Sequence, residues 1–324
     1  MINIKRYNVG IVGVSGLVGS TLLKLLEEYS FPLGELKLFA SMKSVGKEII
    51  FKNKKFYIEE LKENCFNDLD FVFFCAGSEV SKQWVGSAID SGCIVIDNSS
   101  YFRMQEGVGL IIPEVNFSNQ YKLISNPNCS TIQAVVCLNA LKKFGLKRVV
   151  YNTYQAVSGS GIRGINDLKN KEIRFYPYDI NKTCIPQIDM FEENGYTKEE
   201  IKMVNETRKI LNLPFLDIVA TCVRVPVLNS HGVSVLVELE NECSLKDIYE
   251  AFSKQRGLII KEPYPTSIDS NDNDFVYVGR IRKDLSKPNS FLFYTVADNV
   301  RVGAATNAIK IALKIIENPI ALKN

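Results

Sequence analysis

The stretch Tyr-Asn-Val-Gly-Ile-Val-Gly-Val-Ser-Gly-Leu-Val-Gly, residues 7–19, decides the fold class of this chain. Its first half, Tyr7–Val12, is short, apolar and rich in β-forming residues, which predicts a strand. Gly13 permits a tight turn, Gly16 lets a pyrophosphate approach the backbone at the start of a helix, and Gly19 permits close packing of that helix on the strand. A strand, a glycine turn and a helix in this order are typical of the first βαβ unit of a dinucleotide-binding sheet.

The glycine spacing is G-x-x-G-x-x-G rather than G-x-G-x-x-G, so a turn that binds no nucleotide remains the alternative. Its position between the first strand and the expected helix Ser20–Tyr29 favours a nucleotide. The second expected strand, Leu36–Ala40, is followed by Ser41, Lys43 and Ser44, where an NAD enzyme usually has an acidic residue for the ribose 2′-hydroxyl. Two hydroxyls and a cation fit a 2′-phosphate, so the sequence favours NADP over NAD; a polar turn without this role is the alternative.

Length and composition set the class of protein. A chain of 324 residues is long enough for two domains, and 46% hydrophobic with 23% charged residues is the balance of an ordinary globular protein. The net charge of +3 is too small to indicate nucleic acid or a membrane as a partner. No apolar run has the length of a membrane-spanning helix, and the N-terminus enters a strand without the pattern of a signal peptide. We therefore expect a cytoplasmic protein.

The cysteines and the single histidine limit the kinds of site and reaction that the chain can support. The eight cysteines are scattered, mostly in apolar segments, and none forms the close pairs of a metal site. This distribution favours reduced, buried thiols over a disulfide framework, and it predicts no metal. The chain has one histidine, His231, so any reaction that needs an imidazole has only this candidate.

The pattern of strands changes near the middle of the chain. Asp70–Ala76 and Cys93–Asp97 are nearly continuous apolar runs, as expected for parallel strands that are covered on both faces. The second half is richer in strands, and Phe215–Val227 and Gly232–Leu239 are expected to be antiparallel, with His231 in the connection between them.

The predicted fold class is α/β: a Rossmann-like parallel sheet domain plus an α+β domain with a mostly antiparallel sheet. We place the nucleotide-binding domain at residues 1–128 with 300–324, because the amphipathic segment Val302–Glu317 is expected to return to it. The second domain, residues 129–299, is expected to carry the catalytic residues and the contacts between subunits.

A cysteine lies at a predicted helix N-terminus within the stretch Ser125–Ala134. Pro127 fixes its own φ, and Asn128 can cap the helix through its side-chain oxygen. Cys129 would then lie among unpaired N–H groups, which stabilise a thiolate and negative charge on an attached carbonyl oxygen. The local sequence leaves open the alternative of a buried cysteine that acts as a small hydrophobic residue.

The local sequence around several charged or aromatic residues is compatible with more than one role. Arg103 follows the carboxyl end of an expected parallel strand, where it could hold a phosphate or carboxylate, or pair with a nearby acid at the surface. Glu206 and Lys209 lie at i, i+3 on the expected helix Lys198–Leu211 and by spacing alone are typical of a solvated pair. The irregular segment Glu172–Asp189 is long and aromatic, which favours a functional loop or a contact with another subunit.

Taken together, these motifs resemble one family, the aspartate-β-semialdehyde dehydrogenases. The resemblance covers nearly the whole chain, with its motifs in the family's order. The segments that carry it are Gly13–Gly19, Phe39–Gly46, Asn98–Met104, Ser125–Gln133, Thr153–Gly159, Ile185–Asp189, Glu206–Lys209, Cys222–His231 and Ala297–Ala305.

Two related families fit less well around the cysteine. N-acetyl-γ-glutamyl-phosphate reductases usually have a context like Asn-Pro-Gly-Cys-Tyr, whereas residues 126–130 here are Asn-Pro-Asn-Cys-Ser. Glyceraldehyde-3-phosphate dehydrogenases usually have threonines where this chain has Ser-Thr-Ile at residues 130–132. One departure from the resembled family is Lys43, where arginine is frequent; lysine keeps the cation but lacks the planar fork.

The resemblance implies an NADP-dependent oxidoreductase of the aspartate pathway to lysine, methionine, threonine and isoleucine. In the biosynthetic direction, L-4-aspartyl phosphate would be reduced to L-aspartate 4-semialdehyde and inorganic phosphate through a thioester on the cysteine. It also implies small-molecule substrates only, with no nucleic-acid or membrane partner, and a homodimer or homotetramer.

The resemblance also assigns roles to individual residues. Cys129 matches the nucleophile, His231 the acid/base, and Gln155 the residue that orients the thioester carbonyl. Arg224 matches the clamp on the substrate α-carboxylate, and Glu206 the partner of the α-ammonium group. Phosphate-binding positions are matched by Arg103, Lys209 and Asn128. Cofactor-binding positions are matched by Gly13, Ser15, Gly16, Leu17 and Val18 at the pyrophosphate, by Ser41, Lys43 and Ser44 at the 2′-phosphate, and by Ser158, Gly159, Pro186 and Asn299 in the nicotinamide half.

Two rival functions have to be weighed. One is another acyl-phosphate or acyl-thioester reductase, such as one that acts on N-acetylglutamyl phosphate; Glu206 disfavours it, because a carboxylate facing the substrate prefers a free ammonium group. The other is a nucleotide-sensing or structural protein that kept the fold and lost the chemistry. Such a protein should have lost Cys129 or His231, and both are present.

Overall fold

The computed structural model describes residues 5–319, and the chain divides into two compact units. The first comprises the described residues up to Pro113, residues 117–127 and those from Ala304 onward. The second comprises Glu114–Asn116 and Asn128–Gly303. No helix among residues 5–319 is both long and apolar enough to span a membrane.

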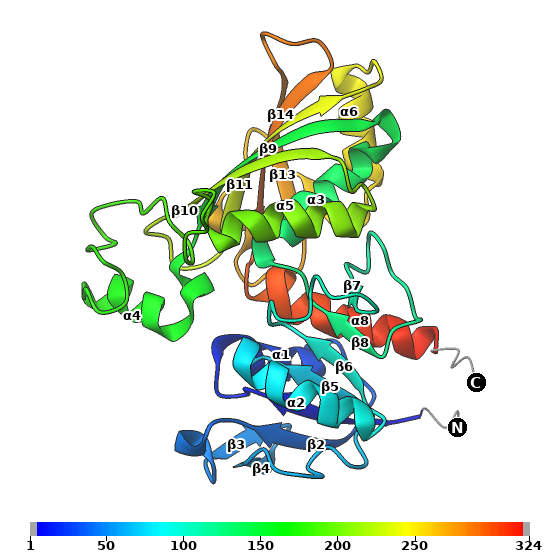
Figure 1. Ribbon diagram of the computed structural model, residues 1–324, viewed down its shortest axis with the longest axis vertical. Coiled ribbons are helices and arrows are strands. Elements are labelled where there is room, and N and C mark those ends of the chain that lie inside the picture. The colour runs from blue at the N-terminus through cyan, green and yellow to red at the C-terminus, as the bar shows by residue number, and fades with distance from the viewer. Residues whose placement is uncertain (1–4, 320–324) are drawn as a thin grey trace. The chain divides into compact units, whose positions relative to one another are not determined.

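The first unit is built on an eight-stranded sheet in the order β3-β4-β2-β1-β5-β6-β8-β7 (Figure 1). Its strand pairs are parallel except β3–β4, which are joined as an antiparallel hairpin. The strands are β1 (Tyr7–Val12), β2 (Leu33–Phe39), β3 (Glu48–Phe51), β4 (Lys54–Glu59), β5 (Phe71–Phe74), β6 (Ile94–Asp97), β7 (Gly109–Leu110) and β8 (Leu123–Ser125).

Helices from both ends of the chain pack in this unit. Helices α1 (Leu17–Glu28) and α8 (Thr306–Glu317) contribute Leu22, Leu25 and Ile309 to one apolar cluster with β1. Helix α2 (Ser78–Asp90) contributes to a separate cluster through Val85 and Ala88. A short 3-10 turn, η1 (Met42–Ser44), follows β2. The sheet is therefore buried by two distinct apolar layers, as a parallel sheet requires.

The second unit is built on a six-stranded sheet in the order β10-β9-β11-β14-β13-β12. The central pairs β9–β11, β11–β14 and β13–β14 are antiparallel, whereas the edge pairs β9–β10 and β12–β13 are parallel. The strands are β9 (Leu146–Gln155), β10 (Asp217–Arg224), β11 (His231–Leu239), β12 (Leu258–Ile260), β13 (Val276–Lys283) and β14 (Ser290–Ala297). Together the two sheets confirm the predicted fold class.

Helices α3 (Cys129–Leu141), α5 (Lys198–Leu211) and α6 (Leu245–Lys254) pack with this sheet, and Figure 1 shows α3 and α5 beside its strands. Helix α3 is buried on nearly all sides, whereas α5 buries one stripe. The remaining elements are α4 (Gly161–Asn170), α7 (Ser267–Ser270), the 3-10 turns η2 (Lys142–Phe144) and η3 (Val157–Ser160), and a π-helical turn, η4 (Arg301–Ala305).

Three details differ from the sequence-based expectations. Helix α1 begins at Leu17 rather than Ser20, because Gly16 already has the extended backbone of an N-cap. Strands β10 and β11 are not paired with each other, because β9 lies between them and pairs parallel with β10. His231 is the first residue of β11 rather than part of a connection. Local sequence patterns identify strands but do not fix which strands are neighbours, which explains the second difference.

Candidate active site

Cys129 is the first residue of α3, and the turn before it is held from two sides. The side-chain oxygen of Asn128 accepts hydrogen bonds from the backbone N–H groups of Ser130 (2.9 Å) and Thr131 (3.2 Å), which confirms the predicted cap. The backbone N–H of Asn128 donates to a carboxylate oxygen of Glu206 at 2.6 Å. Cys129 is partly exposed, although its neighbours in α3 are buried. The thiol therefore has a fixed backbone and an accessible position at a helix N-terminus.

Gly303 approaches the nucleophile closely from the π-helical turn η4. A Cβ atom built at position 303 would lie 2.7 Å from Cβ of Cys129, which is closer than real side chains approach. Only glycine fits at this position without a shift of the backbone or of Cys129. Single π-helical turns are frequent at functional sites, and this one borders the candidate nucleophile.

Strand register brings three further candidates to one end of the six-stranded sheet. Gln155 ends β9 and pairs in register with Arg224, the last residue of the parallel strand β10. His231 begins the antiparallel strand β11, one residue beyond the pair Gly232–Tyr154. Because side chains alternate along a strand, the buried residues Gln155, Arg224 and His231 lie on the same face, the one that carries α3 and α5.

The hydrogen bonding of His231 defines its tautomer. Its Nδ1 accepts a hydrogen bond from the backbone N–H of Ala156 at 2.9 Å, so the ring hydrogen of the neutral imidazole lies on Nε2. Nε2 is buried and has no hydrogen-bond partner among the residues that the structure describes. Burial, and then the nearby Arg224 guanidinium, lower the pKa of His231 well below its usual value near 6.5. His231 is thus a neutral group that offers an N–H donor.

Arg224 is fixed through both its backbone and its side chain. Its Nη1 donates to the carbonyl oxygen of Ala156 at 2.6 Å, and its backbone N–H and C=O both pair with Ile185. A Cβ built at Gly159 would lie 3.0 Å from Nη1 of Arg224 and 3.1 Å from Nε2 of His231. Glycine at position 159 therefore leaves room directly beside both groups.

The amide of Gln155 is held from both ends. Its Oε1 accepts from the hydroxyl of Thr153 at 2.9 Å, and its Nε2 donates to the carboxylate of Glu199 at 3.0 Å. Glu199, in the first turn of α5, also accepts from Nδ2 of Asn128 at 2.8 Å. A buried carboxylate that contacts two candidate site residues was not predicted from the sequence. The signal was the spacing of Glu199, Met203, Glu206 and Ile210, which are all buried on one face of α5.

Glu206 and Lys209 are not the solvated pair that their spacing indicates. Glu206 is 1% exposed and contacts the backbone of Asn128. Burial lowers the pKa of Lys209, while the charge of Glu206 acts in the opposite direction. Glu206 therefore faces the interior of the unit at the Cys129 turn, whereas Lys209 is only partly buried.

Two of the residues expected near a nicotinamide, Ser158 and Asn299, are hydrogen-bonded to each other within the second unit. Ser158 and Asn299 contact each other at 2.9 and 3.1 Å, and Asn299 Oδ1 also accepts from the backbone N–H of Ser230 at 2.9 Å. Pro186 is exposed and directly follows Ile185, whose backbone pairs with Arg224. Asp298 holds the start of the π-helical turn η4, because its Oδ1 accepts from the backbone N–H groups of Val300 and Arg301.

The first unit holds the residues expected to bind the rest of the cofactor. Gly13 has a φ of +90°, and a Cβ there would lie 2.8 Å from the backbone of Cys75. Helix α1 starts at Leu17 with no side-chain cap on Gly16 and no acidic residue in its first turn. Ser15 is exposed, and Gly16, Leu17 and Val18 are partly exposed, so the N–H groups of this turn can receive an anion. The residues present therefore fit a dinucleotide pyrophosphate.

The remaining candidates of the first unit lie at the carboxyl ends of its strands. Ser41 and Lys43 are exposed and Ser44 is buried in the turn that follows β2. Arg103 is 8% exposed and donates from Nη2 to the carbonyl oxygen of Asn98 at 3.0 Å. A cation beside two hydroxyls after β2 is compatible with a phosphate, as the sequence predicts. Among residues 5–319 no cluster of His, Cys, Asp and Glu has the arrangement of a metal site.

Comparison with known proteins shows the family of this chain. Residues 8–123 match the family description "Semialdehyde dehydrogenase, NAD binding domain" and residues 138–302 match "Semialdehyde dehydrogenase, dimerisation domain". The aspartate-semialdehyde dehydrogenase of Aquifex aeolicus is 44% identical over 334 aligned residues, which cover 96% of this chain and 98% of that protein. The chain belongs to the aspartate-semialdehyde dehydrogenase family.

Other members of the family give the same result. The aspartate-semialdehyde dehydrogenase of Bacillus subtilis is 38% identical, with 94% of this chain and 96% of that protein covered. The crystal structure of aspartate semialdehyde dehydrogenase II from Vibrio cholerae superposes with a TM-score of 0.93 at 40% identity, covering 98% of this chain and 100% of that one. The chain is thus an oxidoreductase of this family with a nucleotide-binding domain.

Proposed function

We propose that the protein is an NADP-dependent aspartate-semialdehyde dehydrogenase that converts L-4-aspartyl phosphate into L-aspartate 4-semialdehyde and phosphate through a thioester on Cys129. The observation that supports it most directly is the capped N-terminus of α3, which presents Cys129 in the same unit as Gln155, Arg224 and His231. The crystal structure from Vibrio cholerae that is described as complexed with ASA is 39% identical over 98% of this chain, which supports the same substrate.

The first step of the proposed reaction forms the thioester. The Cys129 sulfur attacks the acyl carbon of aspartyl phosphate, the S–C bond forms, and the C–O bond to phosphate breaks with phosphate as the leaving group. The N-terminus of α3 stabilises the thiolate and the oxygen that becomes negative in the tetrahedral state. Gln155 Nε2 carries two hydrogens, of which Glu199 engages one, so the other is available to the carbonyl oxygen of the thioester.

His231 then acts where negative charge develops on oxygen. Because Ala156 donates to Nδ1, the neutral ring presents Nε2–H, and a neutral imidazole donor can polarise a carbonyl without a proton transfer. A role as acid or base requires the Ala156 bond to be released so that Nδ1 can take up a hydrogen. We therefore propose that His231 serves first as the hydrogen-bond donor to the negatively charged oxygen that would form once the thioester carbon has received a hydride. Collapse of that tetrahedral intermediate breaks the S–C bond, returns the electron pair to the Cys129 sulfur and releases the aldehyde.

Binding of the rest of the substrate uses the charged residues of the same unit. The guanidinium of Arg224 has five N–H donors and is proposed to hold the α-carboxylate, while Glu206 faces the α-ammonium group. Lys209 and Asn128 are proposed to bind the leaving phosphate, and Arg103 is likewise proposed as a phosphate-binding residue. One Nδ2 hydrogen of Asn128 is engaged by Glu199, which leaves the second for the phosphate.

The cofactor is proposed to be NADP, held by the α1 turn and by Ser41, Lys43 and Ser44. Bound there, NADPH would supply the hydride that brings the thioester carbon to the level of an aldehyde. Ser158, Gly159, Pro186 and Asn299 are proposed to contact the nicotinamide half. The absence of an acidic residue in the turn after β2 is what favours the phosphorylated cofactor.

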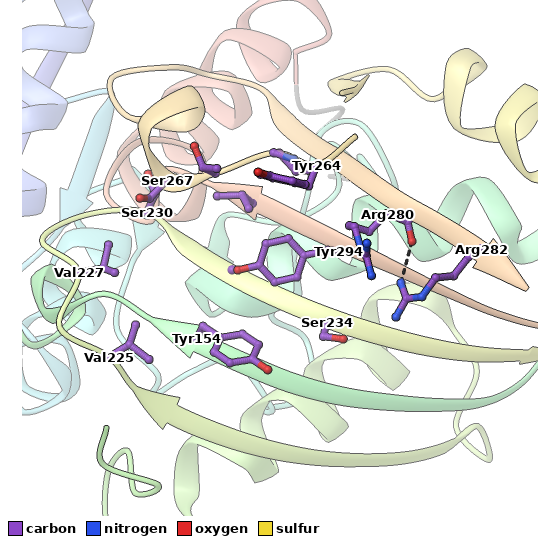
Figure 2. Close-up of a pocket in the computed structure, with 14 residues that line it drawn as sticks. Tyr154, Val225, Val227, Ser230, Ser234, Tyr264, Ser267, Arg280, Arg282 and Tyr294 are labelled. Atoms are coloured by element: carbon purple, nitrogen blue, oxygen red, sulfur yellow. Dashed lines mark hydrogen bonds between the residues drawn. The ribbon is translucent and has the colours of Figure 1, made fainter. Parts of the chain in front are cut away.

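The protein is proposed to be a homodimer or homotetramer that works in the cytoplasm, in the pathway to lysine, methionine, threonine and isoleucine. The face of the six-stranded sheet opposite α3 carries a cavity of about 600 Å³, which Figure 2 shows lined by Tyr154, Tyr264 and Tyr294 with Arg280 and Arg282. Aromatic and arginine side chains are enriched at subunit contacts, so we propose that a second copy covers this face. The loop Tyr176–Ile188 is a weaker candidate, because Tyr176, Ile180 and Ile185 pack in a cluster of their own unit.

The test of the proposed function is phosphate-dependent reduction of NADP with L-aspartate 4-semialdehyde, with Cys129→Ala as the blank. Turnover that needs phosphate and disappears in the variant is the expected result. Turnover no higher than that of the Cys129→Ala variant would contradict the proposed function. The same assay with the N-acetylglutamyl analogue addresses the rival reductase, since a preference for the acetylated substrate would assign Glu206 a different role.

A further inference from the structure

One carboxylate of the second unit contacts two different candidate site residues. Oε1 of Glu199 accepts from Nδ2 of Asn128 at 2.8 Å and from Nε2 of Gln155 at 3.0 Å. Glu199 is only 6% exposed, so these contacts are made in the interior of the unit. Asn128 precedes the nucleophile Cys129, and Gln155 ends β9, so the carboxylate links the nucleophile turn to the sheet.

Both amides are also fixed at their oxygen ends. Asn128 Oδ1 accepts from the N–H groups of Ser130 and Thr131, and Gln155 Oε1 accepts from the hydroxyl of Thr153. An amide that turned over would place its oxygen against the Glu199 carboxylate, where two acceptors would face each other. The carboxylate therefore permits one orientation of each amide and excludes the other.

The other oxygen of Glu199 has a cationic partner. Oε2 lies 3.3 Å from Nζ of Lys202, and the same ammonium lies 2.7 Å from Oδ2 of Asp189. Burial alone would raise the pKa of Glu199, but Lys202 and the two amide donors outweigh it and the pKa is lowered. The Glu199 side chain thus remains a carboxylate, in which Oε1 accepts from the two amides and Oε2 faces the ammonium group of Lys202.

We propose that Glu199 is a positioning residue of the Cys129 site, which orients the amides of Asn128 and Gln155 and so fixes both the cap of the nucleophile helix and the donor that faces the thioester oxygen. This inference rests on the proposed function for the roles of Cys129 and Gln155. Glu199 itself touches neither the sulfur nor the substrate in this scheme. Its effect is expected on kcat, because a misdirected donor weakens the transition state more than it weakens substrate binding.

The substitution that separates orientation from packing is Glu199→Gln, compared in two backgrounds. A glutamine has the same shape but one oxygen only, so it can satisfy either the two amides or the ammonium of Lys202. In the wild-type background Lys202 competes for that oxygen, and kcat is expected to fall about 10- to 100-fold with KM within about threefold. In the Lys202→Met background the competing ammonium is gone, so the same glutamine can turn its oxygen to the amides, and its cost in kcat is expected to be at least about fivefold smaller.

Wild-type turnover is measured first, since its failure would overturn the proposed function and not this inference. With an active wild type, a kcat of Glu199→Gln within about twofold of wild type, or an equal or larger loss in the Lys202→Met background, would overturn the positioning role. Thermal melting of every variant identifies any that do not fold. If Glu199→Gln does not fold, Glu199→Asp takes its place. Aspartate keeps the charge next to Lys202 but is one methylene too short to reach both amides, so a reduced kcat is expected and an unchanged kcat would contradict the proposal.

Discussion

The backbone N–H of Ala156 donates to Nδ1 of His231 at 2.9 Å, and this bond determines which nitrogen of the only imidazole in the chain carries the hydrogen. The ring is completely buried and its Nε2 faces the space beside Gly159. Burial of a neutral histidine makes stability depend on pH, because the unfolded chain binds a proton that the folded chain does not bind.

The first prediction concerns stability against pH. Burial and Arg224 lower the pKa of His231, so as the pH falls below about 6.5 the unfolded state binds a proton before the folded state does. The free energy of unfolding should therefore be retained above that pH and decrease in the pH window below it. His231→Asn keeps an acceptor for the Ala156 N–H and removes the titration, so it should flatten the melting temperature across this window. An equal dependence of the melting temperature on pH in the variant would show that other groups cause the loss of stability.

The second prediction concerns the nucleophile. With Cys184→Ser as background, which removes the exposed thiol, iodoacetamide at neutral pH should modify Cys129 first and to one equivalent. Burial raises the pKa of Cys93 to about 11 and that of Cys137 to about 12, so these thiols should stay unreacted in the folded protein. Peptide mapping by mass spectrometry gives the site. Labelling of Cys129 no faster than that of the partly buried Cys243 would contradict an activated thiol.

The third prediction tests the close approach of Gly303 to Cys129. Gly303→Ala places a methyl group 2.7 Å from Cβ of Cys129, so either η4 or the nucleophile must move. A displacement of this size should lower kcat about 100-fold and cost roughly 1–3 kcal/mol of stability. Gly86→Ala is the matched control, because nothing lies within 4 Å of its Cβ in α2 and alanine should slightly stabilise the helix. Equal activities of the two variants would show that η4 yields without disturbing the site.

The fourth prediction concerns the choice of cofactor. Lys43→Ala should raise KM for NADP about tenfold, because one charge-assisted contact to the 2′-phosphate is lost, and leave KM for NAD unchanged. Lys47→Ala is the control, since that exposed lysine lies just beyond the same turn. Initial rates at saturating substrate give both constants. A parallel change for both cofactors would assign Lys43 to some part of the nucleotide that NAD and NADP share.

Much of the fold follows from local patterns. The strand Tyr7–Val12 and the helix Lys198–Leu211 have the bounds that their sequences predict, because a β-rich run before glycine and a capping box set those ends locally. The insertion of β9 between β10 and β11 could not be predicted in this way. Strand order depends on contacts between distant segments, and the same local pattern is compatible with several orders.

The candidate site likewise contains residues that could be predicted from local sequence and residues that could not. Cys129 and its cap Asn128 were predictable because proline, asparagine and a helical repeat are adjacent in the chain. Glu199 was not, since it stands in the run Lys-Glu-Glu-Ile-Lys, which is typical of an exposed helix start. Its burial is set by the packing of α5 beside the sheet, and its partners are 71 and 44 residues away. The helical spacing of Glu199 with Met203, Glu206 and Ile210 could have indicated its burial, but its contacts with Asn128 and Gln155 could not be predicted from the sequence.

The burial of α3 on nearly all sides has a kinetic consequence for the enzyme. The amides of a helix enclosed in this way exchange with deuterium only when the surrounding core opens, so α3 should belong to the slowest-exchanging part of its unit. The thiol at its first residue should then be displaced mainly when that core opens. Heat should therefore leave the nucleophile in its native position until the core of the second unit itself unfolds.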